Sequence, residues 1–357
     1  MGNLRILSLE YFPLNLALTE SFTIASGAQH KVENVLVKVT LDNGIIGLGE
    51  AAPFPAVSGE TQESALNALQ SLKPLLEGAY LSDWKALAAE MKKRIPHEAA
   101  ARCGVEMALF DALAKSQGVS LYNYFGGKGN VVYTDMTVTA GDVDHARRSA
   151  LAIQQRGIRT IKIKTAGKHI ELDVLRVKAI AEAVPGAPLL IDGNGGYTLD
   201  GALEFADRIV RAGIKPIFFE QPLPRENWKG MTKLSSLCSI PIAADESVRD
   251  LEDVHRIVQE SSIPWINLKL MKSGVAETLE MIALAQKHNR KMMIGGMVES
   301  RLAMNFSAHL AAGSGAFELT DLDTPMFILD SVLDGGWTLE GDKITLPDSP
   351  GHGVFLK

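Results

Sequence analysis

Five short apolar segments of this chain each end on a charged residue, and these charges could together do acid–base chemistry at a metal ion. In order they are Lys164, Asp192, Glu220, Asp245 and Lys269, spaced 28, 28, 25 and 24 residues apart. One strand, loop and helix of an α/β barrel takes about this length, since eight such units make about 250 residues. Because all strands of a barrel point the same way, their last residues meet at one face. The spacing therefore predicts three carboxylates between two lysines.

The segments themselves have the composition of buried strands. Runs this short and this apolar suit strands that are covered on both faces of a parallel sheet. They span residues 160–164, 189–192, 217–220, 241–245 and 265–269. Strand and helix patterns alternate without a break from the segment at 131 to Asp321, which favours a parallel sheet closed into a barrel.

The three acids indicate the kind of metal. Asp192, Glu220 and Asp245 supply only carboxylate oxygens, with no histidine or cysteine alongside. Hard oxygen donors suit Mg²⁺, with Mn²⁺ as a second possibility, better than zinc. A single acid at a strand end is more often a helix cap or a surface charge. Three in successive units favour a metal site.

The lysines on either side are candidate bases. Lys162 and Lys164 are two positions apart on one strand, so both face the same side. Like charge and a nearby cation disfavour a protonated lysine, so we expect a pKa lowered to about 7–8, which suits a general base. For Lys162 alone, simple pairing with a carboxylate is an equal alternative. Lys269 follows the third acid, and a circular barrel can bring it opposite Lys164.

Composition bounds the class of protein. The chain has 357 residues, 46% of them hydrophobic, a net charge of −6 and a pI of about 5.8. The acidic balance argues against a nucleic acid or an anionic membrane as partner. Two cysteines not spaced as a metal pair, with no run as long as a membrane span and no signal-peptide pattern, are typical of a soluble cytoplasmic protein.

The remaining segments predict a second domain. Residues 4–50 read as β structure, and glycines 44, 47 and 49 lie in a hairpin rather than before a helix, which disfavours a dinucleotide site. We expect a long connection at 19–27 and a second loop at 51–59, whose exposed Phe54 either belongs to a rigid turn or covers a ligand. Residues 61–118 are helical in pattern. We place a capping domain at 1–128, the barrel at 129–323, and a C-terminal segment at 324–357 that rejoins the cap.

The motifs around these charges resemble those of the muconate-lactonizing subgroup of the enolase superfamily, along essentially the whole chain. They are Lys162-Ile163-Lys164, Asp192-Gly193-Asn194, Phe219-Glu220-Gln221-Pro222, Ala244-Asp245-Glu246-Ser247 and Asn267-Leu268-Lys269-Leu270-Met271-Lys272. Within the subgroup, Asp321-Leu322-Asp323 resembles the signature of dipeptide epimerases. Gly193 departs from the alanine that is common there and leaves the ligands untouched.

The resemblance implies a fold and a set of roles. The fold is a modified (β/α)7β barrel with an α+β capping domain. One Mg²⁺ per subunit binds Asp192, Glu220 and Asp245, while Lys164 and Lys269 form an acid/base pair. Lys162 assists the substrate carboxylate, and a homo-oligomer is expected.

Further residues are candidates for contacting the substrate. Asp321 and Asp323 share one strand face and could hold an ammonium group by charge-assisted hydrogen bonds, although they could instead cap the turn at Thr324. Met297, in a glycine-rich stretch, could offer main-chain groups, and Thr137 ends the first barrel strand. The eight histidines are scattered, and we interpret them as structural or surface residues.

The function that combines these expectations is Mg²⁺-dependent epimerisation of a dipeptide. The alternatives are o-succinylbenzoate synthesis, N-acylamino acid racemisation, a metal-free Schiff-base lyase, and a binding protein without catalysis. An Asp321/Asp323 ammonium site disfavours the first two, because neither substrate carries a free ammonium group. We expect an apolar second residue after a small first one such as alanine, with an Ala-Glu epimerase as the alternative. The walls that suggest it are uncharged: Ile24, Phe54, Val57, Met297 and Val298.

Overall fold

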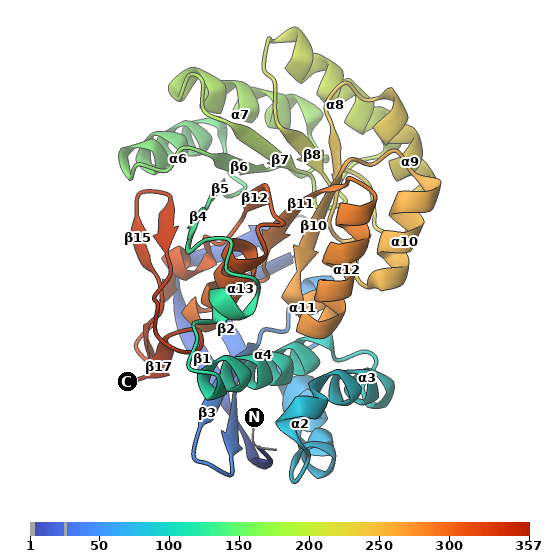
Figure 1. Cartoon of the computed structure of the whole chain (residues 1–357). Coiled ribbons are helices and arrows are strands. Elements are labelled where there is room, and N and C mark those ends of the chain that lie inside the picture. The colour runs from blue at the N-terminus through green and yellow to red at the C-terminus, as the bar shows by residue number, and fades with distance from the viewer. Residues whose placement is uncertain (1–3, 25–26) are drawn as a thin grey trace.

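A parallel eight-stranded barrel forms the centre of the computed structural model, which describes residues 4–24 and 27–357 (Figure 1). Consecutive strands are neighbours throughout. They are β5 (Met136–Val138), β6 (Ile161–Lys164), β7 (Leu189–Asp192), β8 (Phe218–Glu220), β9 (Ile242–Ala244), β10 (Trp265–Lys269), β11 (Lys291–Gly295) and β12 (Leu319–Thr320). The ring closes where Thr134 forms a parallel bridge with Thr320 and the backbone N–H of Asp135 donates to Thr320 O at 3.1 Å.

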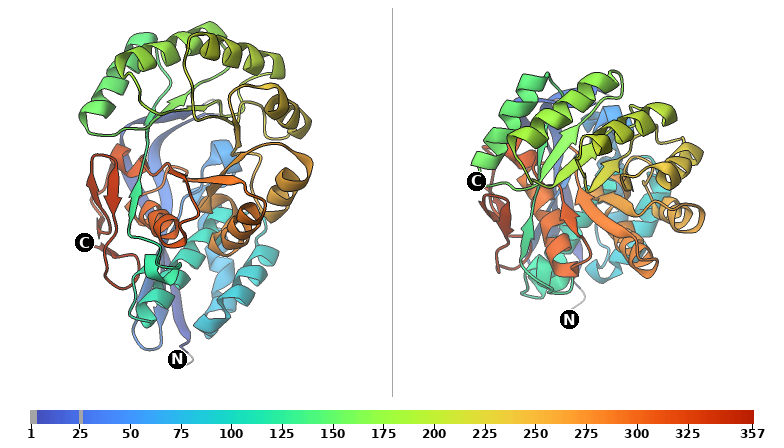
Figure 2. Two further views of the ribbon diagram at one scale, coloured as in Figure 1. Left: turned by 45° about the horizontal axis from the view of Figure 1, so that its top comes forward. Right: turned by 90° about the horizontal axis from the view of Figure 1, so that it is seen from above.

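Each of the first seven barrel strands is followed by a helix, and these helices surround the barrel (Figure 2). They are α6 (Val143–Gln155), α7 (Ile170–Ala183), α8 (Leu199–Arg211), α9 (Trp228–Leu237), α10 (Leu251–Glu260), the short α11 (Leu270–Ser273) with α12 (Val275–Lys287), and α13 (Arg301–Ser314). A 3₁₀ turn, η2 (Thr324–Phe327), follows β12 instead of a barrel helix. The expected (β/α)7β order is confirmed.

Inside the barrel, a layer of apolar side chains lies beneath the charged residues at the strand ends. Side chains at positions i and i+2 of a strand share a face, so Leu190 lies on the face of Asp192 and Phe218 on the face of Glu220. A separate buried cluster contains these interior residues: Leu190, Phe218, Ala243, Trp265 and Met293. β6, β7 and β8 are buried along their whole length because helices cover the outside and this cluster fills the inside.

The capping part is an antiparallel sheet with helices on it. The sheet order is β13 (Ile328–Leu329), β1 (Ile6–Ile24), β2 (Gly27–Leu41) and β3 (Ile46–Ala51). Its helical elements are α1 (Pro55–Ser58), α2 (Gln62–Leu76), η1 (Leu81–Asp83), α3 (Trp84–Arg94), α4 (Ala99–Ser116) and α5 (Leu121–Tyr124). A Cβ on Gly49 would lie 2.0 Å from Gly104 O, so the glycines permit the close approach of β3 and α4. The expected α+β cap is confirmed.

The last residues of the chain pair with earlier parts of it. β13 pairs with β1, and a small sheet joins β4 (Val131–Tyr133) to β16 (Lys343–Thr345) and β15 (Thr338–Glu340). β14 (Leu333–Gly335) pairs with β17 (Val354–Leu356). We propose to keep the division into residues 1–128, 129–323 and 324–357.

Two expectations for the cap are wrong. The connection at 19–27 is mostly strand, because β1 continues to Ile24 and β2 begins at Gly27, with a register shift between Ala17 and Phe22. β-branched and aromatic residues there favour this extension. Phe54 is 4% exposed rather than on the surface, since it packs into the main apolar core.

Among the described residues, no helix combines the length and apolar character that crossing a membrane requires. The cytoplasmic location and the homo-oligomer stay predictions.

Candidate active site

The charged residues at the strand ends lie side by side because the strands are in register. Lys164 is the direct partner of Asp192, and Asp192 is the direct partner of Glu220. Asp245 follows β9 immediately, and Lys269 is the last residue of β10. All five are buried, the three carboxylates completely. β6 and β10 are four strands apart in an eight-stranded ring, so Lys164 and Lys269 lie on opposite sides of it.

Lysine ammonium groups neutralise the three carboxylates. Lys164 Nζ lies 2.7 Å from Asp192 Oδ2, and Lys269 Nζ lies 2.7 Å from Asp245 Oδ2. Lys162 Nζ stands between three acids, 2.7 Å from Asp321 Oδ2, 2.9 Å from Glu220 Oε2 and 3.3 Å from Asp192 Oδ2. The site is therefore a dense array of alternating charges closed off from water.

The carboxylate set fits a hard divalent cation. Glu220 Oε2 and Asp245 Oδ2 are buried and receive no aligned hydrogen bond, although ammonium groups lie at 2.9 and 2.7 Å. The opposite oxygens are held by the protein, since Asn267 Nδ2 donates to Glu220 Oε1 at 2.7 Å and Lys272 Nζ to Asp245 Oδ1 at 2.7 Å. These two acids thus keep one oxygen fixed and leave the other available to a cation, the arrangement that a Mg²⁺ site requires.

Burial and neighbouring charge set the protonation of these acids. Burial, with the charge of Asp192, raises the pKa of Glu220 to about 8. Burial would also raise the pKa of Asp245, but the ammonium groups of Lys269 and Lys272 outweigh it and hold that pKa well below its usual range. Asp245 is therefore ionised at neutral pH, whereas Glu220 needs a further positive charge to ionise fully.

The expected lowering of the lysine pKa is wrong for Lys162, and Lys269, for which no lowering was predicted, behaves in the same way as Lys162. Burial disfavours the charged forms of Lys162 and Lys269, yet the pKa of each lies above its ordinary value. The cause is the carboxylates in contact with each ammonium group, chiefly Asp321 for Lys162 and Asp245 for Lys269. The expectation considered neighbouring cations only, whereas direct carboxylate partners dominate in the folded chain.

A cavity opens over the charged layer. It measures only about 20 Å³, the size of one water molecule, and its walls come from both the cap and the barrel. They comprise Phe54, Val57, Thr137, Lys164, Asn194, Glu246, Lys269, Gly296, Met297, Asp321, Asp323 and Thr324. Most of the predicted substrate-contacting residues are among them. At that volume, the cavity is too small for anything larger than a water molecule.

Two predicted contact residues, Lys162 and Val298, are not among those walls. Lys162 lies below the cavity floor and is completely buried. Val298 is 2% exposed, and its carbonyl oxygen accepts a hydrogen bond from Asn34 Nδ2 at 2.9 Å, which ties the β11–α13 loop to the cap. The side chain of Ile24 lies outside the described residues.

The acids at the end of β12 belong to a second cluster. Asp321 pairs with Lys162, and Asp323 Oδ2 accepts a hydrogen bond from the Thr137 backbone N–H at 2.7 Å. One carboxylate oxygen from Asp321, one from Asp323 and one from Asp135 lie within 4.8 Å of one another. Among the described acids and metal-binding side chains this is the tightest group of three, and Asp192, Glu220 and Asp245 are spread more widely. The sequence analysis missed Asp135.

Two other residues of the site were quoted in motifs without a role. Gln221 has a φ of 33°, and its Oε1 accepts hydrogen bonds from the backbone N–H groups of Asp245 and Ser247 at 3.0 and 3.1 Å. Backbone strain such as that of Gln221 is typical of functional sites. Glu246 lines the cavity, and Asn194 Nδ2 donates to its Oε1 at 3.1 Å. Each follows a predicted metal ligand, and that adjacency was the available signal.

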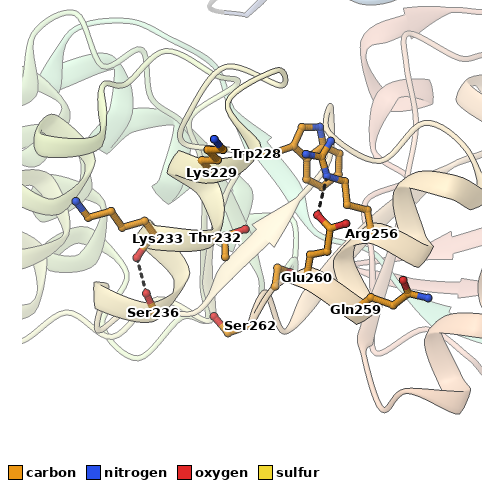
Figure 3. A pocket seen from close by; sticks show the side chains of 10 residues that line it. Trp228, Lys229, Thr232, Lys233, Ser236, Arg256, Gln259, Glu260 and Ser262 are labelled. Carbon is orange, nitrogen blue, oxygen red and sulfur yellow. Dashed lines mark hydrogen bonds and ion pairs between the residues drawn. The ribbon is translucent and has the colours of Figure 1, made fainter.

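A larger groove lies on the outside of the barrel, between α9 and α10 (Figure 3). Arg256 stacks over the Trp228 ring at 4.5 Å and contacts Glu260 at 3.3 Å. Lys229 and Lys233 line the same groove. None of the strand-end residues reaches it, so we place the active site at the barrel mouth.

Comparison with known families agrees with this architecture. Residues 10–126 match the mandelate racemase/muconate lactonizing enzyme N-terminal domain, and residues 144–357 match the enolase C-terminal domain-like family. The chain belongs to the mandelate racemase and muconate lactonizing enzyme family of the enolase superfamily. The predicted resemblance is confirmed.

Relatives within this family include dipeptide epimerases. The chain is 52% identical to an aromatic dipeptide epimerase of Herpetosiphon aurantiacus over 96% of both chains. A crystal structure of a mandelate racemase/muconate lactonizing protein from the same organism has a TM-score of 0.97 at 50% identity, over 99% of both chains. A dipeptide epimerase of Enterococcus faecalis V583, complexed with Mg and the dipeptide L-Leu-L-Tyr, has a TM-score of 0.94 at 28% identity, covering 98% of this chain and 99% of that one.

Proposed function

We propose that this protein is a Mg²⁺-dependent dipeptide epimerase that inverts the α-carbon of the second residue. The observation that carries the proposal is the placement of Lys164 and Lys269 on opposite sides of one cavity, with three buried carboxylates between them. Two bases on opposite faces of a carbon acid can exchange its configuration by removing a proton on one side and returning one on the other. The relatives that are named dipeptide epimerases support the reaction class.

The carboxylates would hold the metal. Asp192, Glu220 and Asp245 are the residues that we assign to Mg²⁺, because their oxygens are hard donors at the mouth of the barrel. A bound ion would supply positive charge next to the substrate carboxylate, which favours loss of the adjacent α-proton. It also supplies the positive charge that Glu220 needs in order to be ionised.

The two lysines would move the proton. One of them, as a neutral amine, removes the α-proton, and the other, as an ammonium group, returns a proton to the opposite face. Each must exchange its carboxylate partner for the substrate, since Asp192 and Asp245 hold their ammonium groups at 2.7 Å. Lys162 remains below the floor and balances the negative charge of the substrate carboxylate from there.

The second acidic cluster would recognise the amino end of the dipeptide. Asp321 and Asp323 line the cavity beside Thr137, and an ammonium group between two carboxylates forms strong charge-assisted hydrogen bonds. Substrates of o-succinylbenzoate synthases and N-acylamino acid racemases carry no such group, so this pair favours a dipeptide. Because Asp321 and Asp323 are assigned to the ammonium group, we assign the metal to Asp192, Glu220 and Asp245.

The cavity wall favours an apolar second residue. Phe54, Val57 and Met297 surround the space above the lysines, and none offers a partner for a charged side chain. Each Val, Leu or Phe side chain buried there gains about 1.5–3 kcal/mol. The name of the Herpetosiphon relative, an aromatic dipeptide epimerase, is consistent with this wall. We propose Ala followed by a hydrophobic or aromatic residue.

The direct test is hydrogen exchange at the substrate. The protein is incubated with Mg²⁺ and a library of dipeptides in heavy water, and mass spectrometry then finds those that gain one deuteron at the second α-carbon. A deuterated dipeptide of inverted configuration supports the proposal. A non-catalytic binding protein would exchange none of them, and a Schiff-base lyase would act after the metal is chelated.

A further inference from the structure

Asp135 is a buried acid that belongs neither to the proposed metal site nor to the pair of catalytic lysines. It lies between β4 and β5, is 2% exposed and does not line the cavity. Among the described residues, no N–H or O–H group is aligned to donate to either of its carboxylate oxygens. An unpaired carboxylate is costly to bury, so the groups around it must explain its presence.

The neighbours of Asp135 are two other aspartates. One carboxylate oxygen of Asp135, one of Asp321 and one of Asp323 lie within 4.8 Å of one another. Closure of the barrel causes this proximity, because the Asp135 backbone N–H donates to Thr320 O at 3.1 Å, one residue before Asp321. Asp135 is also two positions before Thr137 along an extended chain, so both side chains point into the barrel.

Among the described residues, fewer cations contact this cluster than three ionised acids would require. Lys162 Nζ, 2.7 Å from Asp321 Oδ2, is the ammonium group in contact with it. Adjacent carboxylates without a cation between them share a proton instead. Burial and the charges of Asp321 and Asp323 raise the pKa of Asp135 well above its usual range. Burial acts the same way on Asp321, but Lys162 outweighs it and lowers that pKa, so a proton shared by these two acids favours Asp135 over Asp321.

We propose that Asp135 is a positioning residue: as a neutral carboxylic acid it donates a hydrogen bond to Asp321 and holds that carboxylate toward the ammonium group of the substrate. This inference rests on the proposed function. With Asp135 neutral, Asp321 and Asp323 face the ammonium group of a dipeptide N-terminus without a third negative charge beside them. An ionised Asp135 would instead repel Asp321 and demand a second cation.

Two substitutions separate hydrogen bonding from packing. Asp135→Asn keeps the size and can still donate a hydrogen bond through its amide, whereas Asp135→Leu cannot donate. We expect Asp135→Leu to raise KM for Ala-Phe by about tenfold or more, because a lost hydrogen bond to a charged group has about that effect. Its kcat should change by less than about threefold, since the lysines do not contact Asp135. Asp135→Asn should restore most of the affinity.

A second buried aspartate, whose side chain pairs with Arg159 rather than with Asp321, provides the control. Asp342 is 6% exposed and pairs with Arg159 at 2.6 Å, outside the cavity. Asp342→Leu should lower the melting temperature and leave KM for Ala-Phe unchanged. If Asp135→Asn raises KM as much as Asp135→Leu, or if Asp135→Leu leaves KM unchanged, the proposal is wrong.

Infrared spectroscopy tests whether the carboxyl group of Asp135 is protonated, and it does not depend on enzymatic activity. The measurement uses protein with ¹³C-labelled aspartate at a pH above 7. Burial and the charge of Asp321 raise the pKa of Asp323 to about 7, so Asp323 is mostly ionised under these conditions. The carbonyl stretch of a protonated aspartic acid should be present, should disappear in Asp135→Asn, and should remain in Asp342→Asn. Absence of this band in the parent protein would overturn the neutral-acid role. If no dipeptide is epimerised but the band behaves as expected, the proposed function fails while the proton on Asp135 stands.

Discussion

Lys164 and Asp192 are direct partners across β6 and β7, and Lys164 Nζ lies 2.7 Å from Asp192 Oδ2. The carboxylate of Asp192 therefore contacts a proposed base, Lys164, and is also a proposed ligand of the metal ion. A substitution at Asp192 acts on both roles, and so does one at Asp245, which lies 2.7 Å from Lys269 Nζ. Experiments on the metal site and on the lysines must therefore be made separately.

The first prediction concerns the metal. Asp192→Asn, Glu220→Gln and Asp245→Asn should each weaken Mg²⁺ binding by more than about 100-fold, because losing even a supporting group costs 10–100-fold. The fold should persist, since the residues end strands above an intact apolar layer. Mn²⁺ binding by electron paramagnetic resonance, with circular dichroism on the same samples, measures both effects.

The control for the metal site is an aspartate of the other cluster. Asp323→Asn should bind Mn²⁺ about as well as the parent protein, because Asp323 contacts Thr137 rather than the three ligands. The reverse pattern, with binding lost in Asp323→Asn and kept in Asp192→Asn, would place the metal among Asp135, Asp321 and Asp323.

The second prediction concerns the two bases. Lys164→Ala and Lys269→Ala should each reduce epimerisation by about 10²–10⁴-fold, the range that general-base catalysis contributes. Each mutant keeps one lysine on one face of the substrate, so it should still exchange the α-proton of one epimer with solvent. Nuclear magnetic resonance in heavy water, starting separately from each epimer, follows that exchange. Wild-type exchange of both epimers by both mutants would refute the two-base mechanism.

The third prediction concerns the side chain of the second residue. Ala-Phe and Ala-Val should have higher kcat/KM than Ala-Glu and Ala-Lys by at least about tenfold, since a charged group without a partner is costly to desolvate. Phe54→Ala should reduce kcat/KM for Ala-Phe more than for Ala-Val, because the larger side chain loses more contact area. Steady-state kinetics on the four dipeptides measures both effects. A preference for Ala-Glu would contradict the proposal that the cavity wall selects an apolar second residue.

The fourth prediction concerns acid stability. His309 is completely buried, its Nδ1 accepts a hydrogen bond from the Tyr122 backbone N–H at 3.0 Å, and its Nε2 lies 3.2 Å from His352 O. Burial lowers the pKa of His309 to about 3, with a smaller contribution from His352. Because the folded-state pKa is below the unfolded value of about 6.5, the unfolded chain binds more protons as the pH falls. The stabilisation is complete above pH 6.5 and decreases below it.

The size of this effect can be measured by denaturant unfolding. Between pH 7 and pH 5 the free energy of unfolding should fall by about 2 kcal/mol through His309. His309→Gln should be less stable at pH 7 and should lose that part of the pH dependence. His288→Gln, at an exposed position, serves as the control and should keep the slope of the parent. An unchanged slope in His309→Gln would show that this histidine is not the cause.

Much of the barrel could be predicted from local pattern. A buried parallel strand must be apolar throughout, and one βα unit has a nearly constant length, so the order of residues is enough to recognise Asp192, Glu220 and Asp245 as strand ends. The same reasoning fails for 19–27, where polar and small residues suggested a connection although the strands continue. It also fails for Phe54, because nothing in a short proline-rich stretch reveals that the core covers the ring.

The chain by itself therefore determined the fold, the order of the acids and lysines, and the chemical kind of the site, since these follow from the spacing of residues close in sequence. Only the tertiary structure decided which charges face each other. Lys162 meets Asp321 across 159 residues, and their contact reverses the expected direction of the Lys162 pKa shift. Asp135 meets Asp321 only because the barrel closes between Thr134 and Thr320. Electrostatic energies depend on distances between side chains, and chain closure, rather than local pattern, sets those distances.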